Sequence, residues 1–221
     1  MTFLESTNQP ENKPAEKKQE TTRQAQARIT KERIYNCADQ LFCEKGYDNT
    51  TIADIAKAAG VSVGGFYYHF KNKEEIMRLW IAEFDAKYLE YYERVLCAPA
   101  MAHVNVLDKL LLMLIETNKV FSANGYMLSR IAYSIMLKEK EVGDMVIHPD
   151  RDYYRIIHEL IVRAKEEGYF PADMPTALIM HNITIICRGC MVEWILQNGK
   201  NDLVDSIKRL LTHYFNDVRI K

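Results

Sequence analysis

The sequence has little glycine, little proline and almost no net charge. Its 221 residues include 9 Gly and 6 Pro, too few for the many tight turns of a β-sandwich. The 29 Lys and Arg residues nearly balance 30 Asp and Glu residues, which excludes a uniformly basic protein that wraps nucleic acid. Because 48% of the residues are hydrophobic, the chain is able to bury a core and is not expected to be disordered. These absences favour an all-α protein.

Long hydrophobic runs and an even set of cysteines are also missing. The longest uninterrupted apolar run, residues 110–115, is far shorter than the roughly 18 residues of a membrane span. The polar stretch 5–28 lacks the features of a secretory signal, so we expect a cytoplasmic protein with no membrane partner. The 5 cysteines lie in apolar segments, which favours buried thiols over a disulfide framework.

Helical periodicity divides the chain into three predicted parts. Residues 1–27 are polar and are expected to form a flexible tail, although the first helix can also be extended back to about Thr21. Thr30 resembles the N-cap of a helix that ends at Lys45 and Gly46. A small domain is expected over residues 28–73 and a larger helical domain over residues 74–221, with about nine helices in total.

Residues 51–70 have the pattern of two short helices joined by a tight turn. Thr51 and Ser62 are expected to cap the helices, and Gly60 is expected to form the turn. Small and apolar residues such as Ala56 and Phe66 lie where two crossing helices need them. The pattern is that of a helix-turn-helix.

The second of these helices has the composition of a DNA-contacting surface. Gly64 and Gly65 each cost about 1 kcal/mol relative to Ala in a helix, so local stability does not explain them. Close approach of the backbone to another molecule does explain them. Donors to phosphate oxygens follow directly, namely Tyr67, Tyr68, His69, Lys71 and Lys73. Residues 28–73 carry 7 Lys and Arg against 5 Asp and Glu, so this domain is mildly basic.

The stretch TTIADIAKAAGVSVGGFYYHFKNKEEI, residues 50–76, resembles the signature of TetR/AcrR-type transcriptional regulators. The resemblance covers residues 28 to about 80. It implies a homodimer with an N-terminal three-helix DNA-binding domain and a C-terminal helical domain for effector binding and dimerisation. The residues that it implies for DNA binding are Thr51, Ser62, Val63, Gly64, Gly65, Tyr67, Tyr68, His69 and Lys73.

Within this set, the resemblance assigns the reading of the major groove to the second short helix. Thr51 and Lys73 would hold the DNA backbone. The family often has a hydroxyl residue or Ala where this chain has Gly65, so one phosphate contact is not expected here. Val63 offers no hydrogen bond and would contact a thymine methyl group if it reads a base.

We therefore expect a ligand-responsive repressor that binds a palindromic operator in double-stranded DNA and is released by a small, mainly hydrophobic inducer. The alternative is a helical protein-interaction adaptor that does not bind DNA. An enzyme is not expected, because a Gly-rich phosphate loop, a His-Glu-x-x-His motif and a nucleophile with a placed base are all missing. Neither a cofactor nor a metal site is expected, and the sequence leaves repression and activation open.

Polar residues inside otherwise apolar helices are the candidates for ligand binding, although each can equally be a surface group or a satisfied core residue. Arg130 or Arg188 is expected to anchor a polar or anionic end of the inducer. Cys187 and Cys190 form a Cys-x-x-Cys motif inside a predicted helix, which favours buried thiols over a redox or zinc site. The full candidate set is Asn118, Arg130, Tyr133, Tyr154, His158, His181 and Arg188.

The segment Thr176–Leu196 is apolar nearly all round, so more than one side of it must be covered. Residues 168–196 resemble the dimerisation helix of the same family and the loop that enters it. One face is therefore expected to meet the core and the other to meet a partner subunit.

Overall fold

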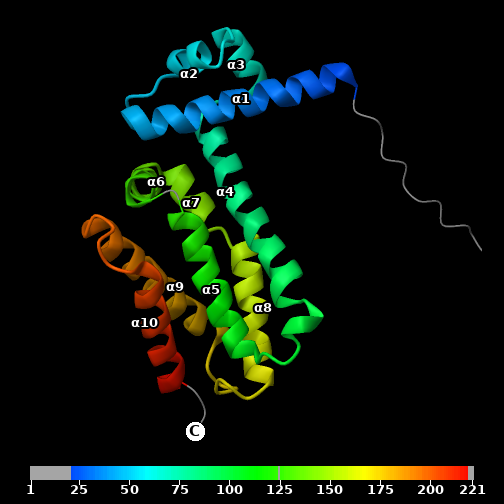
Figure 1. The fold of residues 1–221 in the computed structure, drawn as a ribbon, viewed down its shortest axis with the longest axis vertical. Coiled ribbons are helices and arrows are strands. Elements are labelled where there is room, and N and C mark those ends of the chain that lie inside the picture. The colour runs from blue at the N-terminus through cyan, green and yellow to red at the C-terminus, as the bar shows by residue number, and fades with distance from the viewer. Residues whose placement is uncertain (1–20, 124, 219–221) are drawn as a thin grey trace, which may run out of the picture.

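The computed structural model describes residues 21–123 and 125–218, and within them the chain forms ten α-helices and no strand (Figure 1). The all-α prediction is confirmed, with ten helices where about nine were expected. The predicted tail over residues 1–20 lies outside the described residues. The first four helices are α1 (Thr22–Lys45), α2 (Ile52–Ala58), α3 (Val63–His69) and α4 (Lys73–Tyr91). The others are α5 (Val106–Ser122), α6 (Tyr126–Lys138), α7 (Lys140–Val146), α8 (Asp152–Glu166), α9 (Thr176–Leu196) and α10 (Leu203–Val218).

Helix α1 begins earlier than the predicted cap at Thr30. Thr21 and Gln24 form a capping box, in which the Gln24 amide donates to Thr21 Oγ1 at 3.3 Å and the Thr21 amide donates to Gln24 Oε1 at 2.9 Å. Thr30 lies inside the helix, where its hydroxyl donates to the Gln26 carbonyl at 2.9 Å. The expected cap at Thr30 and the expected tail over residues 22–27 are therefore wrong, and the start near Thr21 is confirmed.

Helices α1 to α3 form a head that sits across one end of α4 (Figure 1). The head has its own core, in which Ile34, Phe42, Ile55 and Phe66 are buried. The first turns of α4 contribute to this core, whereas the later turns belong to the core of the body. Helix α4 is thus a single rigid element shared by both parts.

The body consists of the remaining helices packed around α5, α8 and α9 (Figure 1). Leu110, Leu160, Ile183 and Ile207 are fully buried in its core and come from α5, α8, α9 and α10. Helices α6 and α7 lie beneath the head, and Lys138 of α6 forms an ion pair with Asp48 of the head. The body therefore touches the head through α6 as well as through α4.

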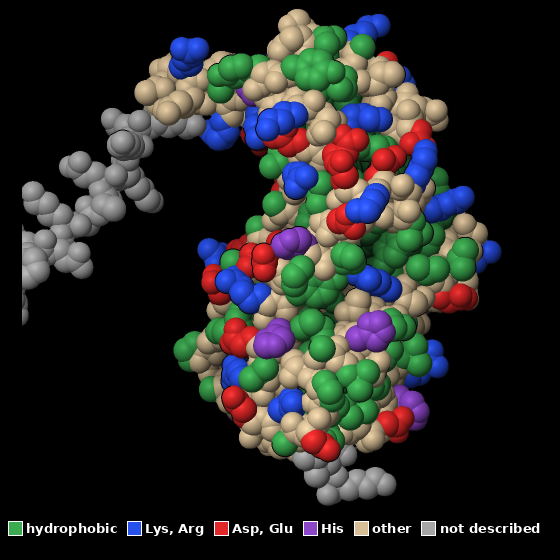
Figure 2. All heavy atoms as spheres, turned by 180° about the vertical axis from the view of Figure 1, so that it is seen from behind, with side chains coloured by type: hydrophobic (Ala, Val, Ile, Leu, Met, Phe, Trp, Pro, Cys, Tyr) green, Lys and Arg blue, Asp and Glu red, His purple; other side chains and the backbone are tan. Residues whose placement is uncertain are grey.

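Helix α9 has two apolar faces, as its composition predicts. One face is buried against α8 and α10 and includes Ile179, Ile183, Cys187 and Met191. The other carries large apolar side chains that are exposed in this single chain, namely Leu178, Ile185, Val192 and Leu196. Among the described helices, α9 is long and apolar enough to cross a membrane, a property that core helices of soluble proteins share. Apolar side chains also gather on the surface of the body seen from behind (Figure 2).

Candidate DNA-reading head and ligand cavity

Helices α2 and α3 and their connection form a helix-turn-helix whose caps match the prediction. Thr51 caps α2 by accepting from the Asp54 amide at 3.1 Å, and Ser62 caps α3 by accepting from the Gly65 amide at 3.0 Å. Gly60 adopts φ +64° in the turn, a conformation that favours glycine. Each cap hydroxyl accepts from an amide of its own helix and so fixes where that helix begins.

One face of α3 is presented to solvent. Val63, Tyr67 and Tyr68 are 45%, 53% and 72% exposed, and the backbone of Gly64 lies beside them. These positions follow the i, i+1, i+4, i+5 spacing of one helix face. Phe66 on the opposite face is fully buried and holds α3 on the head core. An exposed strip of aromatic and apolar groups on a well-anchored short helix is suited to entering a DNA groove.

The two glycines of α3 have different environments. A Cβ atom on Gly64 would come no closer than 3.8 Å to another part of the protein, so contacts inside the chain do not require glycine there. A Cβ atom on Gly65 would lie 3.3 Å from Ser62 Oγ, close to the cap of the helix. The internal packing therefore accounts for Gly65 in part and does not account for Gly64, for which contact with DNA stays a prediction.

Lys73 has an internal role that sequence reasoning missed. Its ammonium donates to the carbonyl oxygens of Tyr47 at 2.7 Å and Thr50 at 2.9 Å, and it lies 4.2 Å from the centre of the Tyr47 ring. This half-buried contact ties the start of α4 to the loop before α2. The side chain expected to hold the DNA backbone is instead engaged within the head. His69 is half-buried, and burial followed by the charge of Lys31 lowers the pKa of its imidazole.

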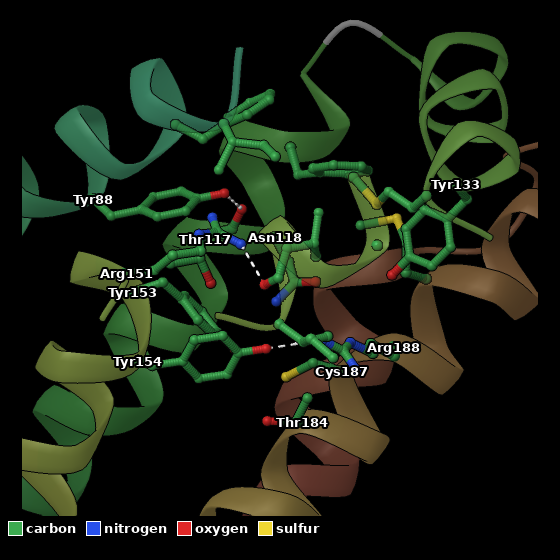
Figure 3. Close-up of a pocket in the computed structure, with 18 of the residues that line it drawn as sticks. Tyr88, Thr117, Asn118, Tyr133, Arg151, Tyr153, Tyr154, Thr184, Cys187 and Arg188 are labelled. Atoms are coloured by element: carbon green, nitrogen blue, oxygen red, sulfur yellow. Dashed lines mark hydrogen bonds between the residues drawn. The ribbon is translucent and has the colours of Figure 1, made fainter. Parts of the chain in front are cut away.

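A cavity of about 230 Å³ lies in the body beside α4 (Figure 3). Aromatic side chains from four helices form much of its wall, including Trp80 and Phe84 of α4, Phe121 of α5, Tyr133 of α6 and Tyr153 of α8. Such a lining suits a ligand that is mainly apolar.

Two arginines supply the positive charge of this cavity. Arg188 of α9 donates to the Tyr154 hydroxyl at 2.9 Å across the cavity (Figure 3). Arg151 forms a two-pronged ion pair with Asp85 of α4, at 2.9 and 2.8 Å, and donates to the Val146 carbonyl at 2.7 Å. Burial alone would lower the pKa of Arg151, but hydrogen bonds to Asp85 and its charge outweigh burial and raise it. The cavity thus combines an apolar wall with fixed cationic donors.

The structure brings four of the seven candidate ligand residues together and separates the other three. Asn118, Tyr133, Tyr154 and Arg188 line the cavity. Arg130 lines a different hollow, between α6 and the head, and the exposed side chains of His158 and His181 do not line the cavity. These three side chains are exposed and form no part of this cavity, so their role in ligand binding stays a prediction.

Sequence reasoning missed Asp85 and Arg151. Asp85 follows the apolar positions Ile81 and Phe84 and precedes Tyr88 at helical spacing, so a charge on the buried stripe of α4 was the available signal. Arg151 stands two residues after Pro149 at the start of α8, where a surface position would be expected. Asp85 and Arg151 are 66 residues apart, so their pairing becomes evident in the folded chain and not in the sequence.

The two cysteines of the Cys-x-x-Cys motif are buried on α9. Burial raises the pKa of the Cys187 thiol to about 12 and also raises that of Cys190. Thiols of this kind are poor nucleophiles and poor metal ligands near neutral pH. This supports the reading of both as packed apolar residues.

The family model described as bacterial regulatory proteins, tetR family, matches residues 34–78. The HTH-type transcriptional regulator AcrR of Shigella flexneri is 28% identical over 194 residues, which cover 80% of this chain and 84% of AcrR.

Two solved structures share the fold. The fatty acid degradation regulator FadR from Bacillus halodurans has a TM-score of 0.66 at 25% identity, over 82% of this chain and 94% of its own. FadR of Thermus thermophilus, a TetR-family transcriptional repressor in complex with lauroyl-CoA, has a TM-score of 0.62 at 20% identity, over 86% and 95% of the two chains.

The matched segment coincides with the head, from the first buried residue of α1 to the early turns of α4. The similarity to AcrR and to the FadR of Bacillus halodurans extends through most of the helical body as well. These similarities support a regulator and give no support to the adaptor. With its exposed recognition helix and its all-helical body, this chain carries the DNA-binding head of the tetR family of bacterial regulatory proteins and is similar over most of its length to transcriptional regulators of that type.

Proposed function

We propose that the protein is a dimeric cytoplasmic repressor that binds a palindromic operator and releases it when a mainly hydrophobic molecule enters the body cavity. The observation that carries this proposal is the position of α4. Trp80, Phe84 and Tyr88 of this helix line the cavity, while Ile76 and Met77 of the same helix belong to the core of the head. A ligand that displaces α4 therefore displaces the head.

The lining of the cavity indicates the chemistry of the inducer. Its aromatic wall fits an alkyl or acyl chain, and Arg188 is placed to bind a polar or anionic end. Asn118 and Tyr133 add further polar groups to the same wall. The lauroyl-CoA bound to the similarly folded FadR of Thermus thermophilus supports the same ligand class. We infer a fatty acyl compound or another amphiphile with an anionic end.

The DNA surface of each subunit is the exposed face of α3. Val63, Gly64, Tyr67 and Tyr68 are assigned to the major groove, with Thr51 and Ser62 supporting the helix through their caps. Dimerisation through α9 and α10 would relate two heads by a two-fold axis, so the operator is expected to be an inverted repeat. Its half-sites are expected to lie about 34–36 Å apart or a multiple of that distance.

The experiment is a DNA-retardation assay on the site that the protein selects from a random duplex library. We expect specific, salt-sensitive retardation that sodium dodecanoate reverses. Arg188→Met is expected to keep the retardation and to lose most of the response to dodecanoate, while the exposed Arg155→Met on α8 should respond like the unaltered protein. Failure to select any site would contradict the DNA-binding function. A complex that persists in saturating dodecanoate, with binding demonstrated by calorimetry, would contradict the mode of release.

A further inference from the structure

The first three turns of α1 form an arm that contributes nothing to the buried core. Within residues 22–33 every side chain is exposed or half-exposed, and the first buried residue of the helix is Ile34. An isolated helix of this length is marginal in water. The capping box at Thr21 and continuity with the rest of α1 support it, but no buried side chain does. Packing within the chain therefore does not explain why a well-capped helix extends so far.

The positive charge of the head is concentrated in this arm. Residues 22–33 contain four basic side chains, Arg23, Arg28, Lys31 and Arg33, against the single acidic Glu32. Residues 34–73, which include the helix-turn-helix, contain four basic and four acidic side chains. The recognition unit itself is therefore neutral, although DNA affinity depends strongly on neutralised phosphates.

The basic side chains of the arm are not spread evenly around the helix. Arg23 and Lys31 continue, at spacings of three and four residues, the stripe that carries the buried Ile34, Ala38 and Phe42. Arg33 lies on the opposite face, and Arg28 lies next to Lys31 and within 4.0 Å of Glu32. One stripe of α1 therefore packs on the head core from Ile34 onward. Before Ile34, where the core ends, the same stripe carries cations.

The arm also lies beside the recognition helix. Lys31 Nζ is 5.2 Å from the centre of the Phe70 ring, which directly follows α3. The N-terminal end of α1 extends past α3 and is the end that rises toward the level of α2 and α3 (Figure 1). Lys and Arg side chains are visible along it in the view from behind (Figure 2).

We propose that this arm is a second DNA-contacting surface, in which Arg23 and Lys31 bind backbone phosphates of the duplex outside the bases that α3 contacts. The inference rests on DNA binding by the head. The arm supplies affinity without sequence preference, because guanidinium and ammonium groups on phosphates neutralise charge and read no base edge. The neutral α3 supplies the selectivity.

The test measures affinity for a 40-base-pair duplex of arbitrary sequence by fluorescence anisotropy. The salt concentration is varied between about 50 and 200 mM KCl, the range over which the affinity of DNA-binding proteins falls steeply. The variant Arg23→Gln/Lys31→Gln keeps the helix propensity of the arm. We expect the slope of log affinity against log salt to become shallower by about 0.9 for each lost phosphate contact, or roughly 2 for each arm. The single variant Arg23→Gln should show about half of that change in slope, and it leaves the contact between Lys31 and the Phe70 ring intact.

The matched control is Arg33→Gln/Lys87→Gln, which removes the same charge from the opposite face of α1 and from α4 in the body. It should leave the slope unchanged. An unchanged slope in the Arg23 and Lys31 variants, with an unchanged melting temperature, would overturn the inference. An equal change in the control would also overturn it, because net charge rather than the arm would then set the affinity. Absence of any binding by the unaltered protein would contradict DNA binding itself.

Discussion

At the residue scale, the proposed DNA contacts depend on side chains that the protein itself does not need. Tyr68 is 72% exposed, and its ring lies edge-on to the His69 ring with centres 4.9 Å apart. Its hydroxyl is free to donate to a phosphate or a base edge. The buried residues of α3 hold the helix, and the exposed residues are available for recognition.

Replacing Tyr68 by Phe removes only this hydroxyl. We expect operator affinity to fall about 10- to 100-fold, since a hydrogen bond to a charged group contributes about 1.5–3 kcal/mol. The free energy of unfolding should change by less than about 0.5 kcal/mol, as for other exposed positions. Anisotropy titration and thermal denaturation measure the two quantities. Tyr91→Phe at the far end of α4 is the control, and equal losses of affinity in both variants would contradict the role of Tyr68.

A variant of Lys73 distinguishes a structural role of this side chain from a contact with a DNA phosphate. The structure ties its ammonium to the carbonyl oxygens of Tyr47 and Thr50, whereas the family resemblance implies a contact with the DNA backbone. Lys73→Met should therefore destabilise the head by about 1–2 kcal/mol and weaken DNA binding through loss of positioning. The salt slope of DNA binding should stay unchanged. A slope shallower by about 0.9 would show instead that Lys73 contacts a phosphate.

At the element scale, α9 is apolar on two faces, and only one of them is covered within a single chain. Leu178, Ile185 and Val192 repeat every seven residues along the exposed face, and Leu196 continues it. A stripe with this repeat is typical of helices that pack against a partner. The burial of the other face in the core leaves this one for a second subunit.

The variant Ile185→Asp/Val192→Asp places two charges on that stripe. We expect it to be a monomer by size-exclusion chromatography with light scattering, and to lose the affinity that comes from two linked heads. The control Val95→Asp/Ile147→Asp makes the same change at exposed apolar residues away from α9 and should remain a dimer. A dimeric Ile185→Asp/Val192→Asp protein would place the interface elsewhere.

Local capping chemistry made most of the head predictable from sequence. Thr51, Ser62 and Asn72 each cap the helix that follows, and each accepts from the backbone amide three residues on. Thr30 failed because the same residue type is accommodated inside a helix by a bond to the carbonyl four residues earlier. A cap residue type therefore marks several of the helix starts in this chain, but its presence alone does not establish that a helix begins there.

The cavity was less predictable, because it depends on where along each helix the neighbouring helices leave space. Arg188 faces the cavity and His181, seven residues earlier on the same helix, is exposed outside it. Asp85 and Arg151 are separated by 66 residues and meet only through the packing of α4 on α8. Periodicity identifies the buried face of a helix, but not which part of that face borders a hollow.

At the scale of the whole molecule, the Asp85 and Arg151 pair joins α4, the helix shared with the head, to the start of α8 beside the cavity. Asp85 is only 9% exposed and sits on α4, and Arg151 both binds it and lines the cavity. Asp85→Asn keeps the shape and removes the charge. We expect a loss of stability of about 3–5 kcal/mol, since removal of one partner leaves the other charge buried and unpaired, and weaker operator binding without ligand.

Thermal denaturation and anisotropy titration measure these two effects. Glu90→Gln is the matched control, because it removes an acid from the same helix whose ion pair, with Arg94, is exposed to solvent. It should change neither quantity appreciably. Operator affinity that is equal in Asp85→Asn and in the unaltered protein would show that the pair stabilises the body without holding the head.

The central claim is that ligand in the cavity moves the two heads through α4. The most direct measurement is the distance between spin labels on the two heads of the dimer, attached through Lys57→Cys on the exposed side of α2 after replacement of Cys37, Cys43 and Cys97. Saturating dodecanoate, with binding verified by calorimetry, is predicted to shift the distance distribution as α4 and the heads rotate. An identical distribution with and without bound dodecanoate would contradict the account.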